Sequence, residues 1–405
     1  MPDDAPEERM NREQGIRLTA TVHARISDIG AADWDRCAGP DNPFVSHAFL
    51  SALEESGSVG TQATGWLPQH VALRDEAGRL LACAPAYIKL HSQGEYVFDH
   101  GWADAFERAG GRYYPKLQVC VPFTPATGPR LLVSPPIEGS GEDSDRLRPA
   151  LVTALVQLCE EAELSSLHVT FPTEAEYRQM GETGLIRRIG QQYHWENRGY
   201  GSFEDFLGAL NSRKRKQIRK ERREAQDSGI AINAYSGGDL KPAHWDAFYR
   251  FYENTIDRKW RWPYLTRDFF DLLGEKLGER VVLFLGEDGT RPVCGALNLA
   301  GTDTLYGRNW GCEEHVKFLH FEACYYRAID WAIEHGMKRV EAGAQGPHKI
   351  QRGYLPAPTY SAHWIAHPGL AEAVARAMDR ERPLVEREIA ALTQEYSPYR
   401  QDSEG

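Results

Sequence analysis

The chain has 405 residues, of which 41% are hydrophobic and 26% charged, and its formal net charge is −11. This length favours two or three domains that each bury a core, and the negative charge argues against broad, non-specific nucleic-acid binding while allowing one local basic site. Seven scattered cysteines without a C-x-x-C pair, and the lack of an 18-residue apolar run, predict a cytoplasmic protein without disulfides, bound metal or membrane span.

The first fourteen residues are acidic and polar, and we expect a disordered tail because they lack the apolar core of a secretion signal. Beyond them the chain contains an internal repeat. An apolar run, a turn that ends in glycine and a second apolar run occur at residues 71–86 and again at residues 282–297, which predicts a β-hairpin in each copy. The matched residues are separated by the same number of positions in every pair: Val71 and Val282, Gly78 and Gly289, Cys83 and Cys294.

The elements around the hairpin are repeated as well. Ser46 and Thr266 stand where the helix that follows each of them requires an N-cap, so both following segments are predicted to be capped helices. After the hairpin we predict a third strand, residues 95–100 in the first copy and 304–310 in the second. A long amphipathic helix and a strand follow in each copy, and both copies end on a strand that contains His-Trp, at His194-Trp195 and His363-Trp364.

This order of elements resembles the acetyltransferase (GNAT) fold, which is an α/β fold with a mixed sheet covered by helices. We therefore predict two tandem GNAT-like domains that arose by internal duplication. The first spans residues 15–200, with an insertion near 104–141, and the second spans residues 201–367. A C-terminal helical tail, residues 368–405, closes the chain.

A basic helix is predicted to open the second domain. Eight of the eleven residues from 213 to 223 are basic, and Glu221 is the single acidic residue among them. Such a concentration of positive charge favours binding of a diphosphate or an RNA backbone, although a solvated helix face is the alternative. The predicted phosphate-binding residues are Arg213, Lys214, Arg215, Arg219 and Lys220.

Two short motifs resemble the Fem-type aminoacyltransferases and their relatives in peptidoglycan biosynthesis or recognition. Arg215, Ile218, Arg219 and Lys220 match the family's Arg-x-x-Ile-Arg-Lys, and Lys349 matches the lysine of its Phe-Lys-x-x-Phe-Gly. The second match is imperfect, because His348 replaces the first phenylalanine and Arg352-Gly353-Tyr354 replaces Phe-Gly. The resemblance implies transfer of an amino acid from aminoacyl-tRNA to an amine of a peptidoglycan precursor, with the acceptor held by the first domain and the donor by the second.

Acyl transfer to an amine requires stabilisation of an oxyanion and a base for the amine proton. By the resemblance, Lys349 lies near the reacting carbonyl, where its ammonium stabilises the oxyanion. The candidates for the base are Asp99, His100 and Glu341; of the first two, which we expect on a strand and so on opposite faces, at most one reaches a given cleft. Further substrate-binding candidates are Tyr96, Trp102, Asn309, Trp310, Arg352 and Tyr354.

The donor is constrained by a motif that the sequence lacks. Residues 312–320 contain no glycine and carry two glutamates, and Pro129 removes a backbone donor from the matching region of the first copy. The loop that binds the pyrophosphate of coenzyme A is thus not recognisable, which favours aminoacyl-tRNA over acyl-CoA and predicts no tightly bound cofactor. An acyl-CoA-dependent acetyltransferase acting on a small amine is the first alternative, and a non-catalytic protein that binds a phosphorylated glycan precursor or RNA is the second. Oligomeric state stays open.

Overall fold

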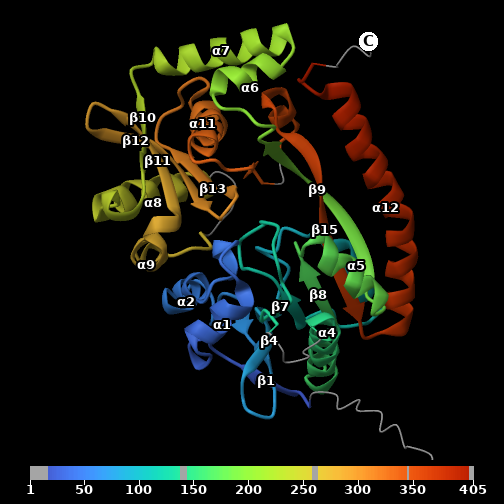
Figure 1. The fold of residues 1–405 in the computed structure, drawn as a ribbon. Helices are drawn as coiled ribbons and strands as arrows, with labels where there is room; N and C mark the ends of the chain where they lie inside the picture. Colours follow the sequence, from blue (N-terminus) through green and yellow to red (C-terminus); the bar gives the residue numbers. More distant parts are fainter. Residues whose placement is uncertain (1–16, 137–143, 258–262, 344–345, 401–405) are drawn as a thin grey trace, which may run out of the picture.

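The computed structural model describes residues 17–136, 144–257, 263–343 and 346–400. The tail predicted at residues 1–14 lies outside them. Two α/β units lie one above the other in Figure 1, with the first unit drawn in blue to green and the second in yellow to orange. Two long strands and the C-terminal helix run along both units.

The second unit follows the predicted order of elements. The Thr266 side chain accepts a hydrogen bond from the Phe269 backbone N–H, as expected of an N-cap. The elements are β10 (Ala231–Tyr235), α8 (Pro242–Asp257), α9 (Arg267–Leu277), β11 (Val281–Asp288), β12 (Arg291–Ala300), β13 (Thr304–Cys312), α10 (Leu319–Phe321), a π-helical segment (Glu322–Tyr326), α11 (Arg327–Glu334) and β14 (Arg339–Glu341).

The first unit repeats this order, and the Ser46 side chain caps its second helix by accepting from the Phe49 N–H. Its elements are β1 (Thr19–His23), α1 (Ala31–Ala38), α2 (His47–Glu55), β2 (Trp66–Pro68), β3 (His70–Arg74), β4 (Leu80–Ala84), β5 (Ala86–Lys89), α3 (His100–Arg108), β6 (Lys116–Val119), β7 (Leu132–Val133), α4 (Ser144–Glu161), β8 (Ser166–Thr170) and α5 (Glu174–Glu182). The prediction of tandem GNAT-like domains is confirmed.

The third strand predicted at residues 95–100 is wrong. Gly94 and Tyr96 have φ angles of +79° and +58°, which an extended strand does not accommodate, and His100 begins α3. The partner of the second hairpin strand is instead a later segment in two pieces, because β6 pairs with β5 and β7 pairs with β4.

The two units exchange their final strands. β9 (Ile186–Glu196) follows the first unit in the chain but pairs with β14 of the second, and β15 (Leu355–Ile365) pairs with β8 of the first. β9 and β15 also pair with each other, so one sheet of order β10-β11-β12-β13-β14-β9-β15-β8-β6-β5-β2 crosses both units. His194 lies opposite Glu341, and the repeated histidine, His363, lies opposite His168. Glu341 and His168 therefore occupy equivalent positions of the two copies.

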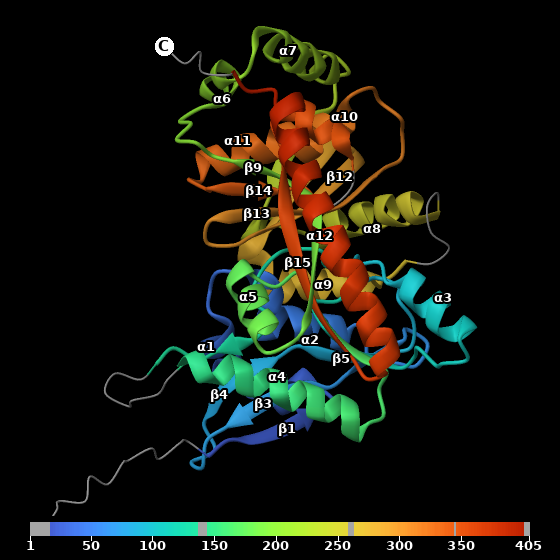
Figure 2. The same cartoon turned by 90° about the vertical axis from the view of Figure 1, so that its right-hand side faces the viewer.

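The C-terminal helical tail is confirmed as α12 (Pro368–Tyr396), which packs along β9 and β15 (Figure 2). The Arg188 Nε of β9 lies 2.9 Å from the Glu381 carboxylate of α12. In the sequence, α6 (Phe203–Ala209) and α7 (Ser212–Gln226) come after the first unit and β9 and before the second unit. Among the described helices, none combines the length and the apolar character needed to cross a membrane.

Two buried histidines join the exchanged strand to the first unit. The Nδ1 atoms of His168 and His363 lie 2.7 Å apart, and the Ser166 and Ser361 hydroxyls lie 2.8 and 2.9 Å from the outer ring nitrogens. Burial lowers the pKa of His168 to about 3 and the pKa of His363 well below its ordinary value. Both rings are therefore neutral in the folded protein at neutral pH, whereas they become protonated below about pH 6.5 in the unfolded chain.

The histidine pair predicts a loss of stability on mild acidification. In this range the two histidine rings bind protons in the unfolded chain but not in the folded protein. The free energy of unfolding should therefore fall between pH 6.5 and 5 by up to about 1.4 kcal/mol per pH unit for each ring. Urea denaturation across this range should give a shallower pH dependence for the His168→Asn/His363→Asn double variant than for the parent. His100→Asn, which changes an exposed ring, should keep the parental slope. Equal slopes for the parent and the double variant would contradict the prediction.

Candidate active site

Strands β13 and β14 of the second unit run parallel and then separate. Their last pair is Tyr306 and Glu341. Just beyond it, Leu297 of β12 pairs with Asn309 while the next residue of β12 pairs with Gly307, so Arg308 is the extra residue of a β-bulge. A bulged residue is left outside the ladder of the sheet. Beyond Tyr306 and Glu341 the two strands no longer pair with each other, and this point is called the gap.

Lys349 reaches this gap from a 3-10 segment, Pro347–Arg352. Its Nζ donates to the Ala342 carbonyl and, at 3.0 Å, to the Gly343 carbonyl, both just after β14. Among the described residues no carboxylate pairs with it, and burial lowers its pKa to about 8. An ammonium has three N–H donors, and one of them has no partner among the described residues.

Glu341 lies at the end of β14 and is buried. Its Oε2 accepts a hydrogen bond from the Thr127 N–H at 3.3 Å, and its Oε1 lies 3.9 Å from the His194 Nε2. Burial raises the pKa of Glu341 to about 7, although the charge of Arg339 opposes the shift. A carboxylate with such a pKa accepts and returns protons near neutral pH.

The ammonium and the carboxylate approach the gap from opposite faces of the sheet. Tyr193 and His194 are consecutive residues of β9, so their side chains point to opposite faces. The Lys349 Nζ lies 5.7 Å from the centre of the Tyr193 ring, whereas Glu341 is close to His194. Lys349 and Glu341 therefore lie on opposite faces of the sheet, near the point where the pairing of β13 and β14 ends.

The equivalent gap of the first unit, between β6 and β8, is filled by residues 120–131. Arg130 is buried there, and its Nε and Nη2 donate to the carbonyls of Thr170 and Ala126 at 3.0 and 2.6 Å. Gly128 adds a backbone hydrogen bond to Phe171 at 3.1 Å. The same loop supplies the Thr127 N–H to Glu341. A segment that fills the gap of one copy thus forms a wall of the site in the other.

The basic helix α7 lies at the end of the molecule far from the first unit (Figures 1 and 2). Arg219 pairs with Glu204 of α6, and the Lys220 ammonium lies 3.6 Å from Glu224. Burial lowers the pKa of Lys214, with a further contribution from Arg213. The structure does not bring the five predicted phosphate-binding residues to the gap between β13 and β14. Arg213, Lys214, Arg215, Arg219 and Lys220 therefore stay predictions.

The buried face of α7 supports the segment that carries Lys349. Glu221 is buried and accepts hydrogen bonds from the Arg352 Nε and Nη2 at 3.1 and 2.9 Å and from the Tyr326 hydroxyl. Tyr354 is buried too, and its hydroxyl donates to the Tyr325 carbonyl at 3.1 Å. Arg352 and Tyr354, expected to touch substrate, are thus engaged within the protein.

The two bases predicted at residues 99 and 100 lie in the first unit. Asp99 precedes α3 rather than lying on a strand, and it is buried 2.5 Å from the Lys116 Nζ and 2.7 Å from the Tyr113 hydroxyl. His100 is exposed. Trp102 packs edge-on against the His363 ring at 4.9 Å. The structure groups these residues with the core of the first unit and not with Lys349 and Glu341.

The three other candidates lie nearer the gap. Asn309 flanks the bulge and borders a narrow crevice between α2 and α9. Trp310 follows it and lies 5.2 Å from the His320 ring. The Tyr96 phenol is close enough to Arg308 to raise the pKa of that guanidinium, against the larger lowering by burial.

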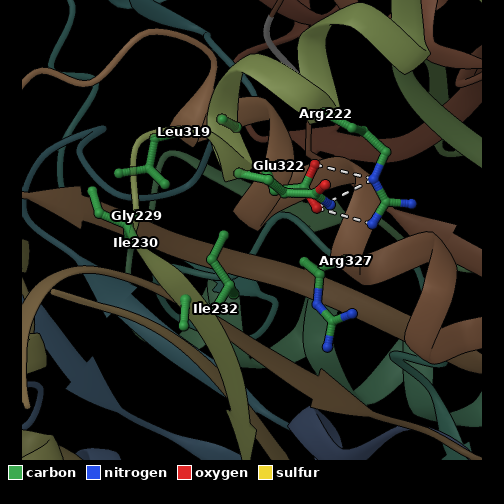
Figure 3. A pocket seen from close by; sticks show the side chains of 10 residues that line it. Arg222, Gly229, Ile230, Ile232, Leu319, Glu322 and Arg327 are labelled. Atoms are coloured by element: carbon green, nitrogen blue, oxygen red, sulfur yellow. Dashed lines mark hydrogen bonds and ion pairs between the residues drawn. The ribbon is translucent and has the colours of Figure 1, made fainter. Parts of the chain in front are cut away.

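A cavity of about 330 Å³ lies among the end of α7, β10 and the π-helical segment (Figure 3). Apolar and charged side chains share its walls: Ile230, Ile232, Leu319, Arg222, Glu322 and Arg327. The Arg222 guanidinium already pairs with Glu322 at 2.9 Å. Because neither Lys349 nor Glu341 lines this cavity, it is separate from the candidate active site.

Three neighbours of the site escaped the sequence analysis: Arg308, Thr127 and Arg130. Arginine is rarely buried, so an arginine inside the strand predicted at residues 304–310 is an unusual placement, and this signal was available for Arg308. Nothing in the sequence marks Thr127, because it contributes a backbone N–H to a carboxylate from the other unit.

Comparison with known proteins gives a family and a fold. A sequence profile described as FemAB-like, peptidoglycan biosynthesis/recognition, matches residues 25–401. The crystal structure of FemX superposes with a TM-score of 0.53 at 11% identity, covering 88% of this chain and 100% of that one. A putative lysylphosphatidylglycerol synthetase C-terminal domain from Agrobacterium fabrum gives a TM-score of 0.52 at 10% identity, with 86% and 96% covered. No curated protein matches the sequence significantly.

The buried pair of Glu221 and Arg352 predicts a large effect on stability. Arg352→Met leaves a buried carboxylate without its cation, so the free energy of unfolding should drop by about 3–5 kcal/mol. Arg219→Met breaks the exposed ion pair between Arg219 of α7, the helix that carries Glu221, and Glu204 of α6. This change should cost less than about 1 kcal/mol. Urea denaturation measures both, and the Glu221→Gln/Arg352→Met double variant should be less destabilised than the sum of its single variants. Equal losses for the two arginine variants would show that the buried pair is unimportant.

Proposed function

The chain belongs to the FemAB-like family of peptidoglycan biosynthesis and recognition proteins and is an acyltransferase, and we propose that it transfers an aminoacyl or acyl group to the amine of a cell-wall precursor. Aminoacyl-tRNA is the donor that we favour, which sets the reaction in the cytoplasm. We retain residues 15–200 and 201–367 as the acceptor and donor domains. The observation that carries the proposal is the approach of Lys349 and Glu341 to one gap from opposite faces of the sheet.

The proposed reaction forms a C–N bond and breaks the C–O bond to the donor. When the amine attacks the carbonyl, negative charge develops on the carbonyl oxygen, and the remaining N–H of the Lys349 ammonium stabilises it. The amine loses a proton to Glu341, which returns it to the departing donor oxygen. The Thr127 N–H holds Glu341 in place throughout.

The start of the helix after β13 supports a donor other than coenzyme A. A pyrophosphate binds best to the free N–H groups of a regular helix N-terminus. Here α10 has three residues and passes directly into the π-helical segment. The loop before it carries Glu313 and Glu314, which lie 4.0 and 2.7 Å from the Arg291 guanidinium, and Glu313 also lies 3.4 Å from Arg250, so both arginines are already paired with carboxylates.

The shifted pKa values predict a bell-shaped pH profile. kcat/KM should rise through about pH 7 as Glu341 loses its proton and fall above about pH 8 as Lys349 loses its own. Glu341→Gln should lower kcat by about 10²–10⁴-fold and abolish the acidic limb. Lys349→Met should lower kcat by about 10²–10³-fold, whereas Lys349→Arg should move the alkaline limb upward.

Two exposed residues provide matched controls for this profile. Glu174→Gln and Lys338→Met change side chains that are 52% and 79% exposed, and both variants should keep the parental rate and profile. Parental activity in Glu341→Gln or Lys349→Met would refute the assigned roles, whereas a parent that shows no turnover with either donor would favour a protein that binds its ligand without catalysis.

The identity of the donor is tested by comparing aminoacyl-tRNA with acetyl-CoA. Purified protein should convert a panel of amines to amides with aminoacyl-tRNA as the acyl source and leave them unchanged with acetyl-CoA. Product formation is measured by mass spectrometry, with Lys349→Met as the negative control. Turnover with acetyl-CoA alone would replace the proposal with an acetyltransferase.

A further inference from the structure

The β-bulge of β13 presents a guanidinium to the contact between the two units. The Arg308 Nη2 donates to the Phe123 carbonyl and, at 3.1 Å, to the Thr124 hydroxyl, both in the loop that fills the gap of the first unit. The guanidinium also lies 5.4 Å from the centre of the Phe44 ring. Arg308 is half-buried, so this charge is held in a fixed place rather than free in solvent.

Within the part of the chain that the structure describes, the charge of Arg308 has no counter-ion. Among the described residues no carboxylate lies within ion-pair distance of it, and the ionisable groups that act on it are the phenols of Tyr96 and Tyr252, which are neutral at pH 7. Burial lowers its pKa to about 10. The Nε and Nη1 groups have no hydrogen-bond partner among the described residues, which leaves three of the five N–H donors unused. Partial burial of a charged guanidinium costs free energy unless an anion lies beside it.

The side chains of Arg308 and Glu341 lie on the same face of the sheet. Tyr306, which lies directly opposite Glu341, packs against the Phe44 ring at 5.2 Å, and Arg308 covers the same ring. Arg308 is two residues, about 7 Å, beyond Tyr306 along the strand, and neighbouring strands lie about 5 Å apart, so the backbone positions of Arg308 and Glu341 are about 8 Å apart. An anion on Arg308 would therefore lie on the face from which we propose the amine to enter.

We propose that Arg308 binds an oxyanion, a carboxylate or a phosphate, of the acceptor, at some distance from the amine that reacts. The planar fork of the guanidinium matches either group with two parallel hydrogen bonds. An α-amino acid carries its amine and carboxylate on the same carbon and does not span this distance, whereas an acceptor with its amine at the end of a chain does. This inference rests on the proposed function, because it takes Glu341 as the residue nearest to the amine.

The test measures binding without a donor. Isothermal titration should give an affinity for 6-aminohexanoate about 10–100-fold higher than for hexylamine or glycine. Arg308→Gln should reduce the affinity for 6-aminohexanoate to that for hexylamine, and Arg308→Lys should restore only part of it. An aminoalkyl phosphate of the same length, compared with 6-aminohexanoate, distinguishes a phosphate acceptor from a carboxylate acceptor. Equal affinities of the parent for 6-aminohexanoate and hexylamine would overturn the proposal.

Two controls separate this proposal from its alternatives. Thr124→Val removes a partner of Arg308 but keeps the guanidinium, so it should lower the unfolding midpoint while preserving the preference for 6-aminohexanoate. If Arg308→Gln does not fold, a reduced preference of Arg308→Lys for 6-aminohexanoate over hexylamine still tests the role of the guanidinium. Binding without any acyl transfer would count against the proposed function alone, whereas transfer that is indifferent to the carboxylate would count against Arg308 alone.

Discussion

The exchange of β9 and β15 is the constraint on which the rest of the structure depends. Each unit borrows its last strand from the other, so the hydrogen-bond ladders of the sheet continue from the first unit into the second. Opening the contact between the units would break ladders of main-chain hydrogen bonds, which is far more costly than separating two domains that touch only through side chains. The position of the first unit against the gap between β13 and β14 is therefore fixed by backbone.

That fixed position lets the duplicated copies take different roles. Equivalent strands of the two copies carry His168 in one case and Glu341 in the other, and the first is sealed in a core while the second faces the gap. Residues 120–131 make the difference, since they fill the gap of their own unit and reach across to Glu341 and Arg308. The loop of the first copy thus fills the gap of its own unit and contacts the site residues of the second copy.

Much of the fold was readable from the sequence, because hairpins, capped helices and the His-Trp strands depend on local patterns. The strand exchange was not, since β9 and β15 carry the same pattern and either satisfies the same neighbour. The segment at residues 95–100 misled us because the left-handed conformation of Tyr96 leaves no mark in a non-glycine residue. Lys349 and Glu341 were named, but the bulge that presents Arg308 depends on the register of β12 and β13, which composition does not encode.

The exchanged strands also order events during synthesis. The first unit leaves the ribosome long before Leu355–Ile365 exists, so the edge of β8 waits uncovered, with its buried histidine exposed, until the chain is almost complete. An unpaired strand edge invites pairing with a second nascent chain.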